Sequence, residues 1–227
     1  MEPKILTLEQ DRFLKLIGRR KKFTERFYLT GGTALSAFYL HHRYSEDLDF
    51  FTEDDVEPLE ITSFIRSLKR DLKYRAAEHH RTLNRNLVFL SFPRRVTLKV
   101  EFTTFLGSPI EPRRRIQGLE VDSLLDIAVN KAFTIAQNAR TRDFIDLYLI
   151  LERERWKFQD LLKKARAKFD VHVDPIQLGS QLLKVTAIHD YPRMISPLKD
   201  SDWQDFFLEE ARLLKSKIFT KGRGRRP

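Results

Sequence analysis

Two aspartates, Asp47 and Asp49, stand two positions apart in a short segment that also contains Leu48 and Phe50. Alternate side chains of a β-strand point to the same face, so a strand here would place the two carboxylates side by side. Neighbouring carboxylates repel each other unless a cation lies between them. Mg²⁺ prefers oxygen ligands and often binds through one or two carboxylates together with substrate phosphates. The spacing therefore predicts a site for Mg²⁺, or for Mn²⁺ in its place, with Leu48 and Phe50 directed into the core.

A glycine pair, Gly31 and Gly32, precedes this segment at a predicted strand-to-helix junction. Two glycines let the backbone approach a phosphate closely, and the amides at the start of a helix attract it. Taken alone, a glycine pair is the usual content of a tight turn, and an isolated Asp-x-Asp is commonly a solvated strand end. The order strand, glycine pair, helix and acidic strand is more specific, and it indicates a phosphate site.

Hydrophobic periodicity and turn signals predict the elements that position these residues. In the N-terminal half we expect a helix from Thr7, capped with Gln10, to about Arg20, further helices at 33–42 and 61–72, and strands at 27–30, 48–51, 86–92 and 96–105. A turn at 93–95 makes the last two strands a hairpin. The second of them alternates apolar and polar residues, which places Lys99 and Glu101 on one polar face.

Residues 107–118 are rich in proline and arginine and are predicted to be a linker. Ser123 with Asp126 indicates a capping box at the start of a helical C-terminal half, with helices expected at 124–138, 143–152, 156–168 and 202–217. The predicted fold is therefore α+β, with a mixed sheet flanked by helices followed by a helical lobe. We place the domains at residues 1–118 and 119–220, with a basic disordered tail at 221–227.

Composition narrows the class of protein. The 227 residues contain no cysteine, which excludes disulfides and thiolate metal sites, and no apolar run long enough for a membrane span. A cytoplasmic location is therefore expected. The formal net charge of +10 favours a polyanionic partner, either nucleic acid or a triphosphate. Basic clusters flank the strand that carries Glu101, at Arg94 and Arg95 and at residues 113–115.

The block from Gly31 to Phe50 resembles the signature of the DNA polymerase β-type nucleotidyltransferase superfamily. Its wording, Gly-Gly-Thr-Ala-Leu and later Arg-Tyr-Ser-Glu-Asp-Leu-Asp-Phe-Phe, resembles the AbiEii/AbiGii toxin family of that superfamily. Lys131 and the segment from Arg140 to Tyr148 look like the second motif block of the same family. The resemblance covers about residues 28–151. It implies that residues 1–118 form a nucleotidyltransferase core.

The resemblance also implies roles for individual residues. The metal ligands would be Asp47, Asp49 and a third carboxylate from a neighbouring strand, for which Glu101 is the best candidate. The other catalytic residues would be Lys131, which contacts the triphosphate, and the aspartates that orient the nucleotide or act as base, Asp143 and Asp146. The substrate-binding residues would be Gly31, Gly32, Thr33, Ser45, Lys99 and Arg142.

Several of these residues have a plainer interpretation. Glu101 could be an exposed strand residue beside Lys99, Lys131 could be a surface lysine, and Asp143 could simply cap its helix. Ser45 could do no more than close the turn before the acidic strand. These alternatives stay open at the level of the sequence.

The function that follows is transfer of a nucleotidyl group from a nucleoside triphosphate to an acceptor, with release of pyrophosphate. The resemblance implies the toxin of a prokaryotic toxin–antitoxin pair, held in check by a separate antitoxin protein, with RNA such as tRNA as the expected acceptor. Two alternatives share the fold. One is a non-catalytic nucleotide- or RNA-binding protein, and the other transfers the nucleotide to a protein hydroxyl.

Overall fold

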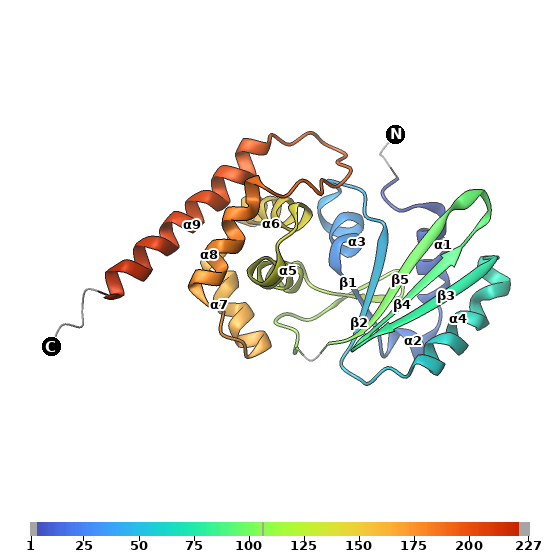
Figure 1. Cartoon of the computed structure of the whole chain (residues 1–227). Coiled ribbons are helices and arrows are strands. Elements are labelled where there is room, and N and C mark those ends of the chain that lie inside the picture. The colour runs from blue at the N-terminus through green and yellow to red at the C-terminus, as the bar shows by residue number, and fades with distance from the viewer. Residues whose placement is uncertain (1–3, 106, 223–227) are drawn as a thin grey trace. The chain divides into compact units, whose positions relative to one another are not determined.

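The computed structural model of the protein describes residues 4–105 and 107–222 (Figure 1). The chain divides into two compact units, Met1–Ile127 and Ala128–Pro227, so the N-terminal unit reaches nine residues beyond the expected boundary at Gly118. Each unit is described by itself. No helix in the described ranges is long and apolar enough to cross a membrane.

A seven-stranded mixed sheet forms the N-terminal unit, in the order β3-β4-β5-β2-β1-β7-β6. The pairs β2–β5 and β1–β7 are parallel, and the other neighbours are antiparallel. The strands are β1 (Tyr28–Thr30), β2 (Asp47–Thr52), β3 (Ala76–Thr82), β4 (Arg85–Ser91), β5 (Thr97–Thr104), β6 (Arg114–Ile116) and β7 (Leu119–Val121). The predicted hairpin is confirmed as β4 and β5, joined by a 3-10 turn at Pro93–Arg95.

Helices pack on this sheet through an aromatic core. Those of the unit are α1 (Leu8–Ile17), α2 (Lys21–Thr24), α3 (Gly31–Leu35), which continues as a π-helical turn over Ser36–Leu40, and α4 (Pro58–Leu72). Rings from α1, α2 and α4 meet Phe50 of β2 and Phe102 of β5, while α3 lies against β1 and β2 (Figure 1). The capping box of Thr7 and Gln10 is confirmed by both of its hydrogen bonds.

The linker predicted at residues 107–118 is wrong for its second half. Residues 114–116 form β6, which turns back through Gln117 and Gly118 into β7. Both turn residues have positive φ, 52° and 84°, which matches the twist that a two-residue hairpin needs. Three-residue strands are too short to show an alternating pattern, so periodicity could not reveal them.

Strand β3 was also missed, for a different reason. Almost all of its side chains are exposed, and its sequence, Ala-Ala-Glu-His-His-Arg-Thr, has no apolar face. The strand forms because its backbone pairs with β4 along seven residue pairs at the edge of the sheet. Backbone pairing of this kind leaves little trace in the side chains.

The described part of the C-terminal unit is helical. Its elements are α5 (Leu124–Asn138), which starts in the preceding unit, α6 (Thr141–Glu154), α7 (Phe158–Phe169), α8 (Pro175–Leu183), a 3-10 turn at Lys184–Thr186, and α9 (Asp200–Gly222). Ring contacts around the buried Phe144, Trp203 and Phe207 form its core. The missed helix α8 does have a sequence signal, because Asp174 caps it and Pro175 occupies its first turn. The expected tail is helical at Lys221 and Gly222, and residues 223–227 lie outside the described ranges.

Candidate active site

Strand β2 presents Asp47 and Asp49 on one face of the sheet, as predicted. Its parallel register with β5 places Lys99 beside Asp47 and Glu101 beside Asp49, so four charged side chains share this face. Leu48 and Phe50 point to the opposite face and are fully buried. The alternation along both strands therefore provides a rigid support for a charged surface.

Cations from the neighbouring strands contact the carboxylates of this cluster. The Lys99 Nζ lies 2.7 Å from Asp47 Oδ2. Arg85, at the start of β4, donates to both oxygens of Glu101, with Nε and Nη2 each at 2.6 Å. The Thr103 hydroxyl donates to the same carboxylate at 2.8 Å. Burial alone raises the pKa of Glu101, but these hydrogen bonds outweigh it and hold the pKa below its ordinary value.

Gly31 lies directly against the Asp49 carboxylate. Its φ is +73°, in the left-handed region that favours glycine, and a Cβ at this position would collide with Asp49 Oδ2. Gly32 is packed similarly, since a Cβ there would lie 2.6 Å from the Arg43 guanidinium and 2.9 Å from Ser45 Oγ. Gly31 thus leaves space for the Asp49 side chain, a use that the sequence analysis, which considered a phosphate site or a tight turn, did not include.

Thr33 and Ser45 have contacts within the protein. The Thr33 hydroxyl donates to the backbone carbonyl of Asp47, which ties helix α3 to the acidic strand. The backbone carbonyl of Ser45 accepts from Gln10 of α1 at 2.8 Å. Both residues therefore help to fix the start of β2, and their predicted contacts with substrate remain predictions.

The donor chemistry of the sheet cluster suits Mg²⁺ at Asp47 and Asp49, which supply hard oxygen ligands from one face. Within residues 4–105 and 107–222, however, no three acidic or histidine side chains converge as a ready-made metal site. Glu101 is next to Asp49, but Arg85 holds its carboxylate. The alternative that Glu101 is an exposed strand residue is wrong, because it is only 5% exposed.

A second charged cluster lies inside the helical unit. Lys131 Nζ lies 3.0 Å from Asp143 Oδ1 and 2.6 Å from Asp146 Oδ2, and Arg140 Nε lies 2.7 Å from Asp143 Oδ2. The surface-lysine alternative is wrong, since Lys131 is 7% exposed. Asp143 does not act as the cap, because the N-cap position is Arg140 and the carboxylate binds the two cations instead. Burial raises the pKa of Asp143, but Lys131 and Arg140 together hold it below its ordinary value.

Two arginines were missed by the sequence argument. Arg140 binds Asp143. Arg142, proposed to bind substrate, makes no ion pair with another described residue, and its role remains a prediction. Arg85 was missed because the predicted strand began one residue later. Extending the pairing of the two hairpin strands outward from the turn at 93–95 would have found it. That register sets Arg85 opposite Thr103, which lies on the same face as Glu101.

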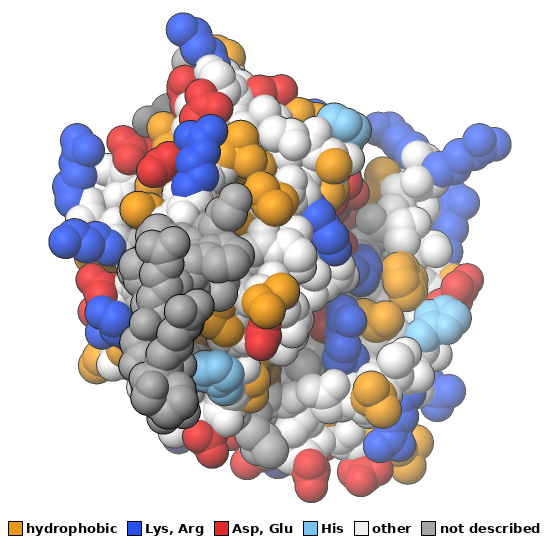
Figure 2. Space-filling view, turned by 60° about the vertical axis from the view of Figure 1, so that its left-hand side comes forward, with side chains coloured by type: hydrophobic (Ala, Val, Ile, Leu, Met, Phe, Trp, Pro, Cys, Tyr) orange, Lys and Arg blue, Asp and Glu red, His pale blue; other side chains and the backbone are white. Residues whose placement is uncertain are grey.

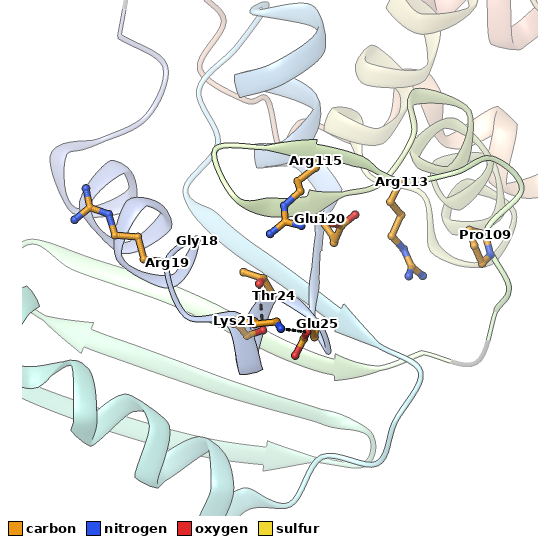
Figure 3. A pocket seen from close by; sticks show the side chains of 9 residues that line it. All are labelled: Gly18, Arg19, Lys21, Thr24, Glu25, Pro109, Arg113, Arg115 and Glu120. Atoms are coloured by element: carbon orange, nitrogen blue, oxygen red, sulfur yellow. Dashed lines mark hydrogen bonds and ion pairs between the residues drawn. The ribbon is translucent and has the colours of Figure 1, made fainter.

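The N-terminal unit also contains an open cavity of about 620 Å³ beside α2 and the β6–β7 hairpin. Figure 3 shows Arg115 reaching toward Thr24 of α2, with Arg19 at the end of α1 on the other side. None of the predicted site residues lines it. Its third arginine, Arg113, is engaged internally, because its guanidinium lies 3.6 Å from the centre of the Tyr28 ring and 2.9 Å from Glu53 Oε1.

The mixed sheet that carries the glycine turn and the paired aspartates has the nucleotidyltransferase fold. MenT4, a nucleotidyltransferase toxin from Mycobacterium tuberculosis H37Rv, shares this fold with a TM-score of 0.59 and 18% identity, over 91% of this chain and 81% of that one. JHP933 from Helicobacter pylori has a TM-score of 0.55 and 18% identity, with 97% of each chain covered.

The chain belongs to the nucleotidyl transferase AbiEii toxin family of type IV toxin–antitoxin systems, whose family model matches residues 13–215. The resemblance seen in the Gly31–Phe50 block is thereby confirmed. An uncharacterized protein of Aquifex aeolicus (strain VF5), aq_aa25, is 30% identical over 145 residues. That alignment covers 63% of this chain and 66% of the relative, just under two thirds of its length.

Proposed function

We propose that the protein is a Mg²⁺-dependent enzyme that transfers a nucleotidyl group from a nucleoside triphosphate to an acceptor. The observation that carries the proposal is the placement of Asp47 and Asp49 on one face of β2, with Gly31 shaped to admit the Asp49 carboxylate. An acceptor hydroxyl would attack the α-phosphorus and lose its proton, while the bond to the β-phosphate oxygen breaks and pyrophosphate leaves.

Residues of the sheet would hold the metal ion and position the triphosphate for this step. Asp47 and Asp49 would hold the metal ion, which when bound offsets negative charge on the triphosphate and helps to orient it. Lys99 fixes the Asp47 side chain through its 2.7 Å contact. The buried Leu48 and Phe50 prevent the strand from shifting. Gly31 borders Asp49, and Gly32 borders Ser45 Oγ. Gly31, Gly32 and Ser45 are proposed to line the phosphate path.

For the helical unit we retain a catalytic role for Lys131, Asp143 and Asp146 as a proposal. A buried ionic cluster stabilises a fold weakly, because desolvation offsets most of the attraction, and strongly perturbed groups gather at functional sites. Lys131 has three N–H donors, and two of them face Asp143 and Asp146. The third has no partner among the described residues and would be available to an oxygen of the substrate.

RNA is the acceptor that the charge of the protein favours. Figure 2 shows Lys and Arg side chains in several separate places on the face in view, which suits a long polyanion held by distributed contacts. Arg19 and Arg115 line the cavity beside α2 and make no ion pair with another described residue. Arg113, by contrast, is engaged by Glu53 and Tyr28, so it belongs to the fold.

The RNA proposal has a direct test in the dependence of binding on salt. Replacing Arg19 and Arg115 by Ser should reduce the log–log slope by up to about 1.4, because each released phosphate contact contributes about 0.7 for a single strand. Replacing Lys164 and Arg166 of α7, two exposed cations, is the matched control. Equal slopes in the cavity variant and the control would remove the cavity from the acceptor surface.

The activity itself is tested with labelled nucleoside triphosphates. Each is incubated with Mg²⁺, total RNA and a cell protein extract, using wild type and Asp49→Asn. Label in RNA with wild type alone supports the proposal, and label in protein alone points to a protein hydroxyl as acceptor. A non-catalytic binding protein would be favoured if neither RNA nor protein is labelled and if the affinity for RNA is unchanged in EDTA and in Asp49→Asn. Co-expression with the neighbouring gene product tests the expected antitoxin.

A further inference from the structure

Glu101 and Arg85 form the best-defined contact of the sheet cluster. Both guanidinium nitrogens that face the carboxylate lie at 2.6 Å, and the Thr103 hydroxyl adds a bond at 2.8 Å. We propose that Glu101 anchors Arg85 rather than a metal ion, and that Arg85 so held forms an anion-binding position for a phosphate group of the nucleoside triphosphate. This inference rests on the proposed function and names a new contact of its site.

The bonding of Glu101 argues against a role as metal ligand. A carboxylate has about four lone-pair positions, and Arg85 and Thr103 occupy three of them, on both oxygens. A two-pronged contact between arginine and carboxylate is among the strongest hydrogen-bonded pairs in proteins. A metal ion could bind Glu101 only by displacing the guanidinium.

Arg85 has donors to spare. A guanidinium has five N–H donors in a fixed plane, and Glu101 takes one from Nε and one from Nη2. The other three have no partner among the residues that the structure describes. The side chain is 49% exposed although Glu101 is buried, so the outer edge of the guanidinium faces solvent. That edge has the planar geometry that pairs with phosphate oxygens.

Arg85 also lies within the field of the two aspartates. Its pKa is raised above the ordinary arginine value, chiefly through the hydrogen bond with Glu101, and the charges of Asp49 and Asp47 contribute. In this cluster Arg85 contacts Glu101 and Lys99 contacts Asp47, so each of these cations lies among carboxylates. A triphosphate would be repelled by the carboxylates alone, and a cation fixed beside them offsets that repulsion.

The test is a double-mutant cycle with Glu101→Gln, Arg85→Gln and the double variant. A non-hydrolysable nucleoside triphosphate measures substrate affinity, and Mn²⁺ alone measures metal affinity. Each single change should weaken nucleotide binding by roughly 10- to 100-fold, because hydrogen bonds to charged groups are the strong ones. The double variant should bind no more weakly than Arg85→Gln, since Glu101 acts through Arg85. Mn²⁺ affinity should fall by less than about tenfold in all three, below the loss expected when a partner of a metal ligand is removed, because Asp47 and Asp49 are unchanged.

Two further variants serve as controls. Arg85→Lys keeps the charge without the planar fork and should recover only part of the nucleotide affinity. Arg81→Gln removes an exposed arginine of β3 and should change nothing. The proposal is overturned if Glu101→Gln weakens Mn²⁺ binding tenfold or more, or if Arg85→Gln leaves nucleotide affinity unchanged. If wild type binds Mn²⁺ but no nucleoside triphosphate, the proposed function fails first, and this inference fails with it.

Discussion

Two charged clusters of similar composition occupy very different surroundings. On the sheet, Asp47 and Lys99 form a pair whose side chains are 27% and 29% exposed. In the helical unit, the side chains of Asp143, Asp146 and Lys131 are 3%, 0% and 9% exposed. Water can reach the side chains of the first cluster, whereas those of the second contact one another and are shielded from water. The same residue types therefore form a partly solvent-exposed cluster in one unit and a largely buried cluster in the other.

The difference in exposure decides what each ion pair contributes. An exposed pair is screened by water and adds about 0–1 kcal/mol to stability. Removing one partner of a buried pair leaves an uncompensated charge and costs about 3–5 kcal/mol. The contrast between the clusters can therefore be measured with single substitutions.

The largest effect is expected for Lys131→Met. It leaves the buried Asp143 and Asp146 without their shared cation and should lower the free energy of unfolding by about 3–5 kcal/mol. Lys99→Met, its counterpart on the sheet, should change it by less than about 1 kcal/mol. Urea unfolding of both variants measures this, and similar losses would show that the two clusters do not differ in the way their exposure indicates.

On the sheet, activity should be far more sensitive than stability to loss of a carboxylate. Asp47→Asn and Asp49→Asn should each reduce nucleotide transfer by more than about 100-fold. Loss of an outer-shell partner of a metal costs up to about 100-fold, and loss of a direct ligand should cost more. The free energy of unfolding should stay within about 1 kcal/mol of wild type, since a partly exposed ion pair contributes little and neighbouring carboxylates repel each other. The exposed Asp55→Asn, just beyond β2, is the control. A drop in melting temperature of many degrees without Mg²⁺ would make the pair structural.

Acid should affect the helical cluster through Asp143. Its folded-state pKa is depressed, so its ionised form stabilises the protein above the ordinary aspartate pKa of about 4. That stability is lost as pH falls through the folded pKa, at up to about 1.4 kcal/mol per pH unit for one proton. The difference in melting temperature between wild type and Asp143→Asn should narrow below about pH 4. The exposed Asp205→Asn should show no such trend, and a constant difference for Asp143→Asn would contradict the assignment.

The smallest effects concern two glycines, one in each unit. Gly31→Ala places a Cβ against Asp49 at a positive φ, which should cost at least about 1–2 kcal/mol and reduce activity. Gly179→Ala in α8 meets no atom within 4 Å and should stabilise by about 0.5–1 kcal/mol through helix propensity. Thermal melting of both variants gives the comparison, and equal signs would show that space at Asp49 is not limiting.

Elements with strong local signals could be predicted from the sequence. Helix α5 begins and ends where expected, at Leu124 and Asn138. The alternation in β5 correctly placed Lys99 and Glu101 on one polar face, and the register with β2 shows that Asp47 and Asp49 share it. These predictions succeeded because side-chain periodicity is a property of neighbouring residues.

The predictions that failed depended on contacts between distant segments. Strands β6 and β7 exist because β7 pairs with β1, about ninety residues earlier in the chain. The surface interpretation of Lys131 failed because the next helix, α6, supplies the two aspartates that contact it.

The sequence by itself determined which residue types are present and which face of a strand or helix each one occupies. It placed the paired aspartates, the glycine turn and the polar face of β5, because these follow from spacing along one segment. Only the tertiary structure decided the partner of each charge. Arg85 meets Glu101 through the register of a hairpin, and Lys131 is buried through the packing of two helices. Partner and burial set the electrostatic energy of a charge, so the roles of these residues emerge only once the chain is folded.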